Sequence, residues 1–587
     1  MCGIAGIFAY SDQAPPVARE ELLRIRDYME RRGPDGAGLW MSDDERVGLA
    51  HRRLAVIDLT PGGAQPMESA CGRYQITFNG EIYNYRELKA ELEHAGATFR
   101  SQSDTEVLLQ LYAREGAAML PRLRGMFAFG VWDSEEQSLF LARDTFGIKP
   151  MYYADDGRSL RFASQVKALV AGGGVDAAID SEGECEYWIW GHIPEPLTIY
   201  HAVRSLEAGS WVKIRRGGAR ESARFESVAS LLSPQAQREP FSSAKLHDVL
   251  LDSVRHHLIA DVPVGVFLSA GIDSATLAAL AAESGYRVRT LTLGFEEFRG
   301  TARDETPVAA KVAKAIGSEH ETHWITRRDF EEAVEGFLHS MDQPSIDGLN
   351  TWLISRAAAR AGLKVVISGL GGDEFFGGYP SFRHVPLMRR VVRPFAAIPF
   401  LGTLTRQLAA PLVRQFTNEK FAGLLEYGST WQGAYMLRRA MRMPWQLPPG
   451  RVAARFELPS LADDHLMVSN LEATRYMRNQ LLRDSDWASM AHSIELRVPL
   501  VDREVTRHVA AQRAMGRGYT KLDLAASSSR ALPACVTSQP KRGFVLPQRE
   551  WLMARDPRRN ARGLLDWSRF IYQNFTGAHR ENPPAHH

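Results

Sequence analysis

Cysteine at position 2 is the residue of this chain whose type and position most directly suggest chemistry. Small residues follow it in the run Met1-Cys2-Gly3-Ile4-Ala5, so removal of the initiator methionine would leave a chain that begins with cysteine. A thiol is a good nucleophile only as the thiolate, which requires a base near neutral pH. An α-amino group titrates near pH ~8 and would lie on the same residue. The position predicts an N-terminal nucleophile, although a cysteine after Met1 can also be incidental.

A strand that ends in a tight turn carries groups that such a nucleophile needs. The apolar residues 74–78 are followed by Asn79-Gly80-Glu81. Acyl transfer creates a negatively charged oxygen, which preorganised N–H donors stabilise. The Asn79 side chain and the Gly80 backbone N–H would supply two donors.

Two further residues suggest the kind of ligand that would bind there. Arg53 can pair with a carboxylate through two parallel hydrogen bonds. Asp104, in Ser103-Asp104-Thr105-Glu106, belongs either to a helix cap or to a site for a ligand ammonium group. A ligand with both a carboxylate and an ammonium group is an amino acid.

A second set of candidate residues lies in a turn between a strand and a helix, at 269–274. The small residues of Ser269-Ala270-Gly271-Ile272-Asp273-Ser274 let backbone N–H groups approach a phosphate, and the following helix places its positive end there. Asp273 suits a Mg²⁺ ion that bridges phosphates, and Asp373 in the glycine-rich turn 368–374 is a second candidate ligand. The turn is not a GxxxxGK[ST] loop, so transfer of a γ-phosphoryl group is not implied.

The elements that must position these residues change in type along the chain. The first part reads as short strands broken by turns, with helical patterns near 18–30 and 84–95, which is typical of an α+β domain with antiparallel sheets. The second part alternates apolar strands with helices, which predicts a buried parallel sheet, and becomes mostly helical after about residue 380. The predicted divisions are a first domain at 2–210, a polar linker at 211–243, a second domain at 244–565 and a poorly ordered tail at 566–587.

The composition is that of a soluble globular protein of several domains. The chain has 587 residues, of which 71 are basic and 69 acidic, and the net charge of +2 gives no argument for a nucleic-acid or membrane partner. It has no apolar run of ~20 residues and no pattern of a secretory signal. Its four cysteines are too widely spaced for a disulfide framework or a zinc site, and we expect a cytoplasmic protein.

Five segments of the first part, taken together, resemble the glutaminase domain of class II glutamine amidotransferases. The resemblance implies that Cys2 attacks the side-chain amide of glutamine, that Asn79 and Gly80 hold the oxyanion, and that glutamate and ammonia are released. It also implies that glutamine is bound by Arg53, Asn79, Gly80, Glu81 and Asp104. The matching segments are Cys2–Gly6, Arg32–Gly36, Asn79–Asn84, Ser103–Glu106 and Arg143–Tyr153.

The second part is similar to the synthetase domain of glutamine-hydrolysing asparagine synthetases. The turn at 269–274 resembles the SGGxDS pyrophosphate loop of ATP pyrophosphatases, with Ala270 in place of the middle glycine. The resemblance covers 2–380 densely and 470–547 loosely, but not 381–470. It implies an α/β ATP-pyrophosphatase domain that binds Mg²⁺ through Asp273 and Asp373, with Lys541 beside the phosphates. The ATP-binding residues that it implies are Leu268, Ser269, Gly271, Asp273, Ser274, Leu293, Ser368 and Gly369.

The two resemblances together imply one reaction sequence. ATP adenylates a carboxylate with release of pyrophosphate, and ammonia made at Cys2 attacks the adenylate to form an amide, as in asparagine synthesis from aspartate. Ammonia must arrive unprotonated, so we expect an enclosed path between the two domains. The implied partners are glutamine, ATP, a carboxylate acceptor and a second copy of the chain in a homodimer.

The residues expected near the acceptor depart from the family pattern. Leu370 stands where asparagine synthetases have a glutamate, and Asp347 stands where they have an arginine that binds the acceptor carboxylate. Trp487 and Gln165 replace an arginine and a glutamate. We hypothesise that the acceptor is not free aspartate; alternatively, a branch of the family tolerates these changes and still makes asparagine.

Three other functions are open at this point. An amidotransferase for sugars or phosphoribosyl substrates would share the first domain, but the turn at Ser269–Ser274 argues against it. A lactam synthetase would need no ammonia, so an intact Cys2 site would be superfluous. A non-catalytic binding protein predicts the loss of Cys2, Asp273 and Asp373, and all three are present.

Overall fold

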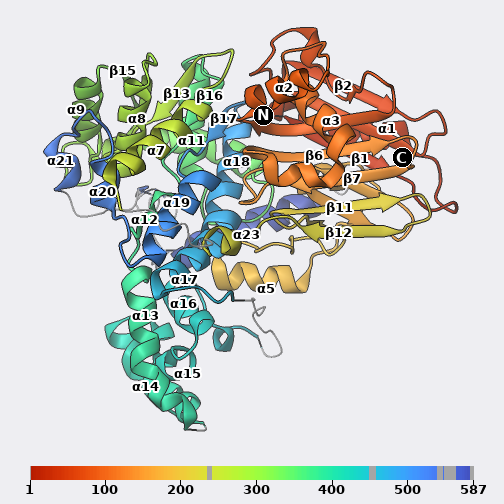
Figure 1. Cartoon of the computed structure of the whole chain (residues 1–587). Coiled ribbons are helices and arrows are strands. Elements are labelled where there is room, and N and C mark those ends of the chain that lie inside the picture. Colours follow the sequence, from red (N-terminus) through yellow and green to blue (C-terminus); the bar gives the residue numbers. More distant parts are fainter. Residues whose placement is uncertain are drawn as a thin grey trace.

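The computed structural model describes residues 2–233, 241–398, 400–448, 458–538, 546–547, 551 and 564–581. Figure 1 shows two bodies of different construction: a β-rich first domain and a second domain in which helices surround a parallel sheet. A group of helices projects from the second domain.

The first domain contains two antiparallel sheets of six strands each. The first sheet consists, in spatial order, of β10 (Val203–Ser205), β8 (Tyr152–Asp155), β9 (Leu160–Ala163), β1 (Gly3–Phe8), β3 (Val47–Arg53) and β2 (Gly36–Met41). The second consists of β12 (Arg220–Arg224), β11 (Ser210–Arg215), β7 (Ser138–Arg143), β6 (Gly125–Asp133), β5 (Tyr74–Ile82) and β4 (Met67–Glu68).

The two sheets pack face to face, and helices cover their outer faces. Strand β1 shows why: Ile4 and Phe8 belong to the core between the sheets, whereas Ala5 and Ile7 belong to the core under the helices. Side chains alternate along a strand, so an entirely apolar strand is buried on both faces. The covering helices are α1 (Arg19–Tyr28), α4 (Val166–Ala171), α2 (Tyr85–His94) and α3 (Asp104–Glu115). This layering places Cys2, immediately before β1, at the end of a rigid central strand.

The second domain is built on a five-stranded parallel sheet in the order β15-β14-β13-β16-β17. The chain runs outward from β13 to β15 in one direction and then continues with β16 and β17 on the other side. This reversal is a topological switch point, and in such sheets ligands bind at the carboxyl ends of the two strands that flank it. The strands are β13 (Val264–Phe267), β14 (Arg289–Phe295), β15 (Glu319–Ile325), β16 (Val365–Ile367) and β17 (Glu495–Arg497).

Helices flank this sheet and form the projecting group. Those near the sheet are α7 (Ser243–His257), α8 (Ile272–Glu283), α9 (Thr306–Ile316), α10 (Arg327–Ser340), α11 (Leu349–Arg360), α12 (Gly372–Phe376), α18 (Arg483–Met490), α19 (Arg503–Ala514), α20 (Lys521–Ala525) and α21 (Ala534–Thr537). The projecting group and its base contain α13 (Ser381–Val392), α14 (Leu401–Phe416), α15 (Leu424–Tyr427), α16 (Trp431–Arg439) and α17 (Asp464–Leu471) (Figure 1). Three further helices are α5 (Ser181–Trp190), α6 (Val228–Leu231) and α23 (Leu564–Glu581). A π-helix, Glu472–Leu482, joins α17 to α18.

The structure confirms the predicted fold class but differs from the sequence analysis at two segments. Residues 211–243, predicted as a linker, contain strand β12 and most of β11, and β11 pairs with β7. The strand pattern was weak because β12 is an exposed, polar edge strand. The predicted tail is helical as far as Glu581, and α23 buries Trp567, Ile571 and Phe575, which are spaced four residues apart on one face.

Candidate functional site

Cys2 lies in a buried position between β5 and the second domain. Its backbone N–H donates to the Asn79 Oδ1 at 3.0 Å, and the Arg32 Nε donates to its carbonyl oxygen at 3.1 Å. The pairing of Gly3 with Arg52 fixes the direction in which the chain leaves the residue. Burial raises the pKa of the Cys2 thiol, whereas nearby positive charge, including that of Arg53, lowers it. To react as a thiolate, the thiol would therefore need a base within reach, and removal of Met1 would leave an amino group on the same residue.

Asn79 is the residue best placed to stabilise charge beside Cys2. It is completely buried on β5, and its Nδ2 has no hydrogen-bond partner among the described residues. A buried donor without a partner costs about 1–3 kcal/mol, so it is available to an acceptor that binds later. The neighbouring Gly80 packs so closely on β6 that a Cβ atom there would come within 2.1 Å of the Met126 carbonyl oxygen. The structure thus brings Cys2, Asn79 and Gly80 together.

Asp104 and Arg53, the predicted ligands for glutamine, are both held by backbone groups. The helix cap of α3 is Ser103, whose side chain accepts from the Thr105 N–H, so the Asp104 carboxylate does not serve as the cap. That carboxylate accepts from the Ile82 N–H at 3.1 Å, and burial raises its pKa to about 6. The Arg53 guanidinium donates to the Thr60 carbonyl oxygen at 2.9 Å and to the Asp58 carbonyl oxygen.

Glu81, also predicted to bind glutamine, lies at the contact between the domains. It is buried 3.3 Å from the Arg497 guanidinium, which pairs with Glu495 at 2.6 Å. Burial and the charge of Glu495 raise the pKa of Glu81, although Arg497 opposes them. The position of Glu81 therefore connects the Cys2 region to strand β17 of the second domain.

The two predicted phosphate-binding turns meet at the switch point of the parallel sheet. The hydroxyls of Ser269 and Ser274 lie 2.9 Å apart, and the Ser269 N–H donates to the Ser274 Oγ at 3.0 Å. The second turn follows β16, and a Cβ atom on Gly369 would come within 2.9 Å of the Ser274 nitrogen. The predicted ATP-binding residues Leu268 and Leu293 also lie close together here. The hydroxyl of Thr292, the neighbour of Leu293 on β14, donates to the Leu268 carbonyl oxygen at 2.6 Å.

Lys521 joins the two predicted magnesium ligands, and the sequence analysis missed it. Its Nζ pairs with Asp273 and lies 2.8 Å from the Asp373 Oδ1. Burial lowers the pKa of Lys521, but the two carboxylates outweigh burial and raise it. No motif surrounds Lys521, which is separated from Asp273 by most of the domain, so only the fold reveals it. Lys541, the predicted phosphate-binding lysine, lies outside the described residues.

The two predicted acceptor residues occupy different surroundings. Asp347 lines a cavity of about 290 Å³, which Leu370 does not line; Leu370 packs against the main hydrophobic core. Burial raises the pKa of Asp347. Trp487 lies beside the loop that contains Asp347, since a Cβ atom on the next residue, Gly348, would come within 2.6 Å of the Trp487 ring.

The cavity at Asp347 has aromatic and cationic walls that come from both domains. Trp190 from α5 and Tyr435 from α16 supply aromatic surface, and Arg475 and Tyr476 come from the π-helix. The Arg439 guanidinium lies 4.0 Å from the Tyr476 ring centre and pairs with the buried Glu472 at 2.8 Å. Burial lowers the pKa of Arg475 to about 10. The sequence analysis missed these arginines because Arg439 lies in 381–470, which the resemblance does not cover, and Arg475 lies in 470–547, which it covers only loosely.

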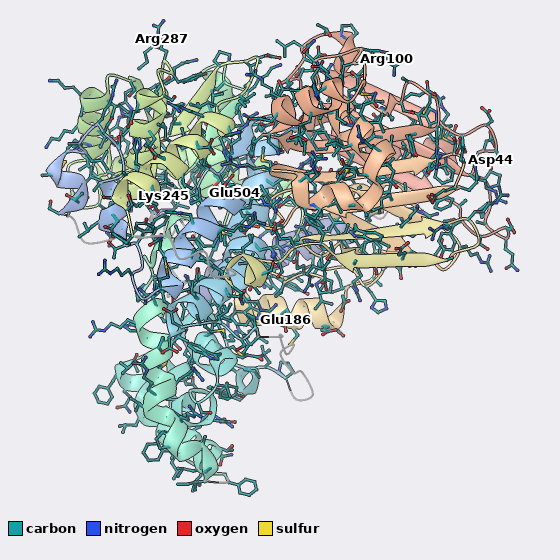
Figure 2. The ribbon with its side chains drawn as sticks, in the orientation of Figure 1. Asp44, Arg100, Glu186, Lys245, Arg287 and Glu504 are labelled. Atoms are coloured by element: carbon teal, nitrogen blue, oxygen red, sulfur yellow. The ribbon has the colours of Figure 1, made fainter. Side chains whose placement is uncertain are left out.

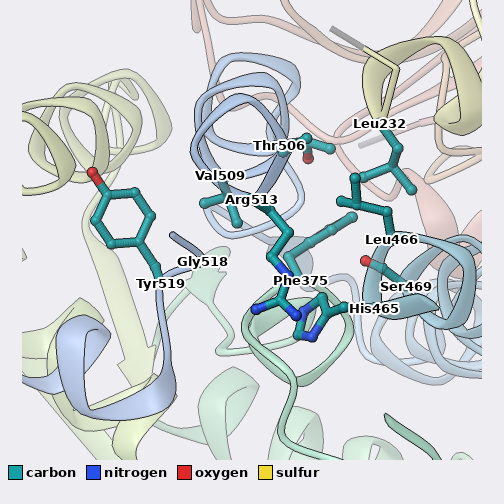
Figure 3. Close-up of a pocket in the computed structure, with 11 residues that line it drawn as sticks. Leu232, Phe375, His465, Leu466, Ser469, Thr506, Val509, Arg513, Gly518 and Tyr519 are labelled. Carbon is teal, nitrogen blue, oxygen red and sulfur yellow. The ribbon is translucent and has the colours of Figure 1, made fainter. Parts of the chain in front are cut away.

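A second cavity, beside α12 and α19, is too small for a substrate (Figure 3). It has a volume of about 10 Å³, which is room for roughly one water molecule. His465 and Arg513 are among the residues around it.

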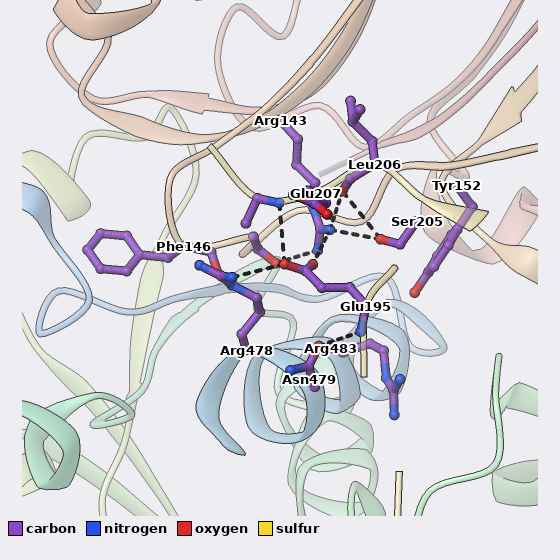
Figure 4. A network of polar contacts seen from close by, with 12 residues as sticks. Arg143, Phe146, Tyr152, Glu195, Ser205, Leu206, Glu207, Arg478, Asn479 and Arg483 are labelled. Atoms are coloured by element: carbon purple, nitrogen blue, oxygen red, sulfur yellow. Dashed lines mark hydrogen bonds and ion pairs between the residues drawn. The ribbon is translucent and has the colours of Figure 1, made fainter. Parts of the chain in front are cut away.

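Buried ion pairs hold the two domains in contact. Figure 4 shows Glu195 between two arginines, with Arg143 at 2.8 Å and Arg478 of the π-helix at 2.9 Å. Burial would raise the pKa of Glu195, but the two guanidinium groups outweigh it and hold the pKa below its usual value. A second pair joins Arg32 to Asp486 of α18 at 2.7 Å. The segment Arg143–Tyr153 of the sequence analysis thus contributes to the domain contact.

Comparison with known proteins gives the family. A model described as a glutamine amidotransferase domain matches residues 1–225, and one described as asparagine synthase matches residues 245–579. The chain is 34% identical over 574 residues to asparagine synthetase [glutamine-hydrolyzing] 1 of Bacillus subtilis, which covers 94% of this chain and 88% of that protein. The chain belongs to the glutamine-hydrolysing asparagine synthetase family.

Two more relatives show the breadth of this family. Asparagine synthetase [glutamine-hydrolyzing] 3 of Bacillus subtilis is 29% identical over 531 residues, covering 87% of this chain and 80% of that protein. Amidase chry2 of Gibberella zeae is 31% identical over 413 residues, covering 65% of this chain and 60% of that protein. The chain is a glutamine-dependent amidotransferase with a synthetase domain, a carbon–nitrogen ligase.

Proposed function

We propose that this member of the asparagine synthetase family uses ATP and Mg²⁺ to adenylate a carboxylate larger than free aspartate, and aminates it with ammonia from glutamine. The observation that carries the choice of acceptor is the cavity at Asp347, with its aromatic walls and its two arginines.

Cys2 is the proposed nucleophile for glutamine hydrolysis. Its α-amino group takes the thiol proton, and the sulfur attacks the side-chain carbonyl of glutamine. Asn79 Nδ2 and the Gly80 N–H donate to the oxygen that becomes negative, which lowers the barrier because the donors are already oriented. Arg53 pairs with the glutamine carboxylate and Asp104 with its ammonium group, while Glu81 orders the adjoining turn through Arg497.

The turns at the switch point are the proposed ATP site. Backbone N–H groups of Ser269 to Ser274 bind phosphate oxygens, and the backbone near Leu268, Leu293 and Ser368-Gly369 holds the adenosine. Mg²⁺ favours one or two protein carboxylates together with phosphate oxygens, which fits the pair Asp273 and Asp373. Lys521, already between these carboxylates, stabilises charge on departing pyrophosphate, and Lys541 is proposed to do the same.

The acceptor cavity explains how this chain manages without the usual arginine at position 347. An aspartate side chain there repels a carboxylate, but Arg475 and Arg439, which pairs with Glu472, line the same cavity and bring positive charge to it. The aromatic rings of Trp190 and Tyr476 provide flat surface, which suits an acceptor with an apolar or planar body. Asp347 then favours a hydrogen-bond donor or cation on that acceptor.

A screen of pyrophosphate release tests the choice of acceptor. The complete protein is given ATP, Mg²⁺ and glutamine with aspartate, aromatic amino acids, N-acylated amino acids or uronic acids. We expect a larger acid to exceed aspartate in kcat/KM by about tenfold or more, since pocket contacts discriminate by such factors. Aspartate as the best acceptor would establish the second candidate, asparagine synthesis, which the similarity to the Bacillus subtilis enzyme supports.

We also propose a cytoplasmic location and a homodimer. All four cysteines are free thiols, which suits a reducing compartment. Sedimentation analysis of the purified chain tests the dimer.

A further inference from the structure

The helices that project from the second domain expose apolar side chains along their length. We call residues 381–416 the basic arm; it comprises α13, the short turn of helix Arg393–Ala397, and α14 (Figures 1 and 2). Soluble helices normally turn an apolar stripe toward a core and a polar face toward water. The basic arm departs from that rule.

One face of α14 is fixed against the rest of the projecting helices. Gly402 lies so close to α15 that a Cβ atom there would come within 2.5 Å of the Glu426 Cα. The Arg406 Nε donates to the Glu426 carboxylate at 2.5 Å, and its guanidinium lies 4.8 Å from the Trp445 ring centre. Gly402 and Arg406 are four residues apart, so together they mark the inner face.

The outer face of α14 carries a continuous apolar stripe. Residues at intervals of four lie on one side of a helix, and here every position of that series is a leucine or a phenylalanine. Their exposed fractions range from 54% to 86%, although they are large apolar side chains. The stripe consists of Phe400, Leu404, Leu408, Leu412 and Phe416.

A second exposed apolar group lies on the preceding part of the arm. Leu387, Val391, Phe395 and Ile398 are each about half exposed, between 46% and 56%. So many exposed large apolar side chains on one short segment suggest a site of association.

The charge of the arm differs from that of the whole chain. Residues 381–416 contain six arginines and no aspartate, glutamate or lysine, whereas the whole chain has a net charge of only +2. Arg390 and Arg406 pair with Asp464 and Glu426 outside the arm, whereas Arg383 and Arg393 are exposed and form no ion pair within the described ranges. The even balance of the whole sequence, from which we expected no membrane partner, therefore conceals a local excess of positive charge.

We propose that the basic arm binds the surface of a membrane that contains anionic lipids. Helices with Phe and Leu on one face and Arg on the others lie in the headgroup region, with apolar side chains reaching the acyl chains and arginines meeting lipid phosphates. Each basic residue near such a surface contributes to binding, and the contribution is screened by salt.

Two other occupants of this face fit less well. A second copy of the chain would bring the same arginine-rich arm against itself, and like charges repel. Insertion across a bilayer does not match the helices either: within the described residues, no helix combines the length and the apolar character that a membrane crossing requires. The arm therefore binds at the surface and leaves the domains in water.

Vesicle flotation of the complete protein tests the proposal. We expect binding to phosphatidylcholine vesicles that contain phosphatidylglycerol, at least about tenfold weaker binding to phosphatidylcholine alone, and release as the Debye length falls from ~10 Å at 0.1 M salt to ~3 Å at 1 M. The variant Leu404→Gln/Leu408→Gln/Leu412→Gln should lose at least about tenfold in binding because its stripe no longer enters the acyl region.

A matched control changes exposed apolar residues outside the arm. Ile179→Gln/Met515→Gln should bind vesicles like the wild type, and both variants should hydrolyse glutamine at the wild-type rate, which shows that they are folded. Equal binding of the wild type and the triple variant would overturn the proposal. So would a concentration-dependent dimer, measured by light scattering, that the triple variant abolishes while vesicles capture neither protein.

Discussion

The proposed glutaminase centre and the proposed acceptor cavity are assembled in opposite ways. The first takes Cys2, Arg53, Asn79 and Asp104 from the sandwich alone, where strands β1, β3 and β5 and the start of helix α3 hold them. The second takes its walls from residues between Trp190 and Leu564, supplied by both domains and by the π-helix. Residues held by a rigid core can be substituted only at a cost in stability. A cavity lined by added helices can change its residues, and so its acceptor, without a change in the reaction that the protein catalyses.

The largest expected effect removes the first centre and leaves the second. Cys2→Ala should lower glutamine-dependent synthesis by about 10³-fold or more, because it removes the thiol that is the proposed nucleophile. Synthesis with an ammonium salt should continue. The measurement is product formation with each nitrogen source. Loss of both activities would mean that the centres do not work separately.

The next largest effect concerns the buried contact between the two domains, in which Asp486 pairs with Arg32 and Lys149. Asp486→Asn takes the carboxylate partner from the buried Arg32 and removes one negative charge beside Lys149, and breaking such a buried pair costs about 3–5 kcal/mol. Burial raises the pKa of Asp486, but the charges of Arg32 and Lys149 outweigh burial and hold the pKa below its usual value. The loss in the free energy of unfolding should therefore be complete above pH ~4 and should shrink as the pH falls and the wild-type carboxylate is protonated.

Denaturant unfolding at several pH values measures this difference. The exposed pair Asp12–Arg216 serves as a control, and Asp12→Asn should change the free energy of unfolding by less than about 1 kcal/mol. Similar losses in both variants would show that the buried contact is no stronger than a surface pair.

Disabling the phosphate site should spare glutamine hydrolysis. Asp273→Asn should reduce pyrophosphate release by about 10²-fold, since it removes a proposed Mg²⁺ ligand and a partner of Lys521. Lys521→Met should reduce it as well. Glutamate formation by both variants should match the wild type. Undiminished pyrophosphate release by Asp273→Asn would exclude that residue from the site.

A pH profile separates the glutamine site from the rest. Asp104 must be ionised to bind an ammonium group, and its pKa is raised to about 6. The kcat/KM for glutamine should therefore fall below pH about 6, by about tenfold for each further unit. Asp104→Asn should have a low kcat/KM without this step. A profile identical to that of the wild type would assign the pH dependence to another group.

The smallest effect should appear in the acceptor cavity. Tyr476→Ala removes an aromatic wall and should raise the KM for the acceptor by about tenfold or less, while the KM for ATP and the rate of glutamine hydrolysis stay unchanged. Steady-state kinetics with the acceptor found in the screen provide the measurement. An equal rise in the KM for ATP would place Tyr476 in the nucleotide site instead.

The sequence predicted the two domains, the antiparallel sheets of the first, the parallel sheet of the second and the motif-bearing turns. It misjudged β11 and β12 because an exposed edge strand lacks the apolar alternation that identifies a buried one. It also misjudged the end of the chain, where Trp567, Ile571 and Phe575 order α23 only by packing on residues far away.

The sequence alone determined the chemistry that short motifs encode: a thiol at the chain start, an amide and a glycine on one strand, and small residues between a strand and a helix. Such motifs work because their residues are neighbours on one element, so spacing fixes geometry. Only the tertiary structure decided that Lys521 meets Asp273 and Asp373, and that Arg439 and Arg475 line the same cavity as Asp347. These arrangements depend on contacts between distant segments, which burial and packing select and local spacing does not record.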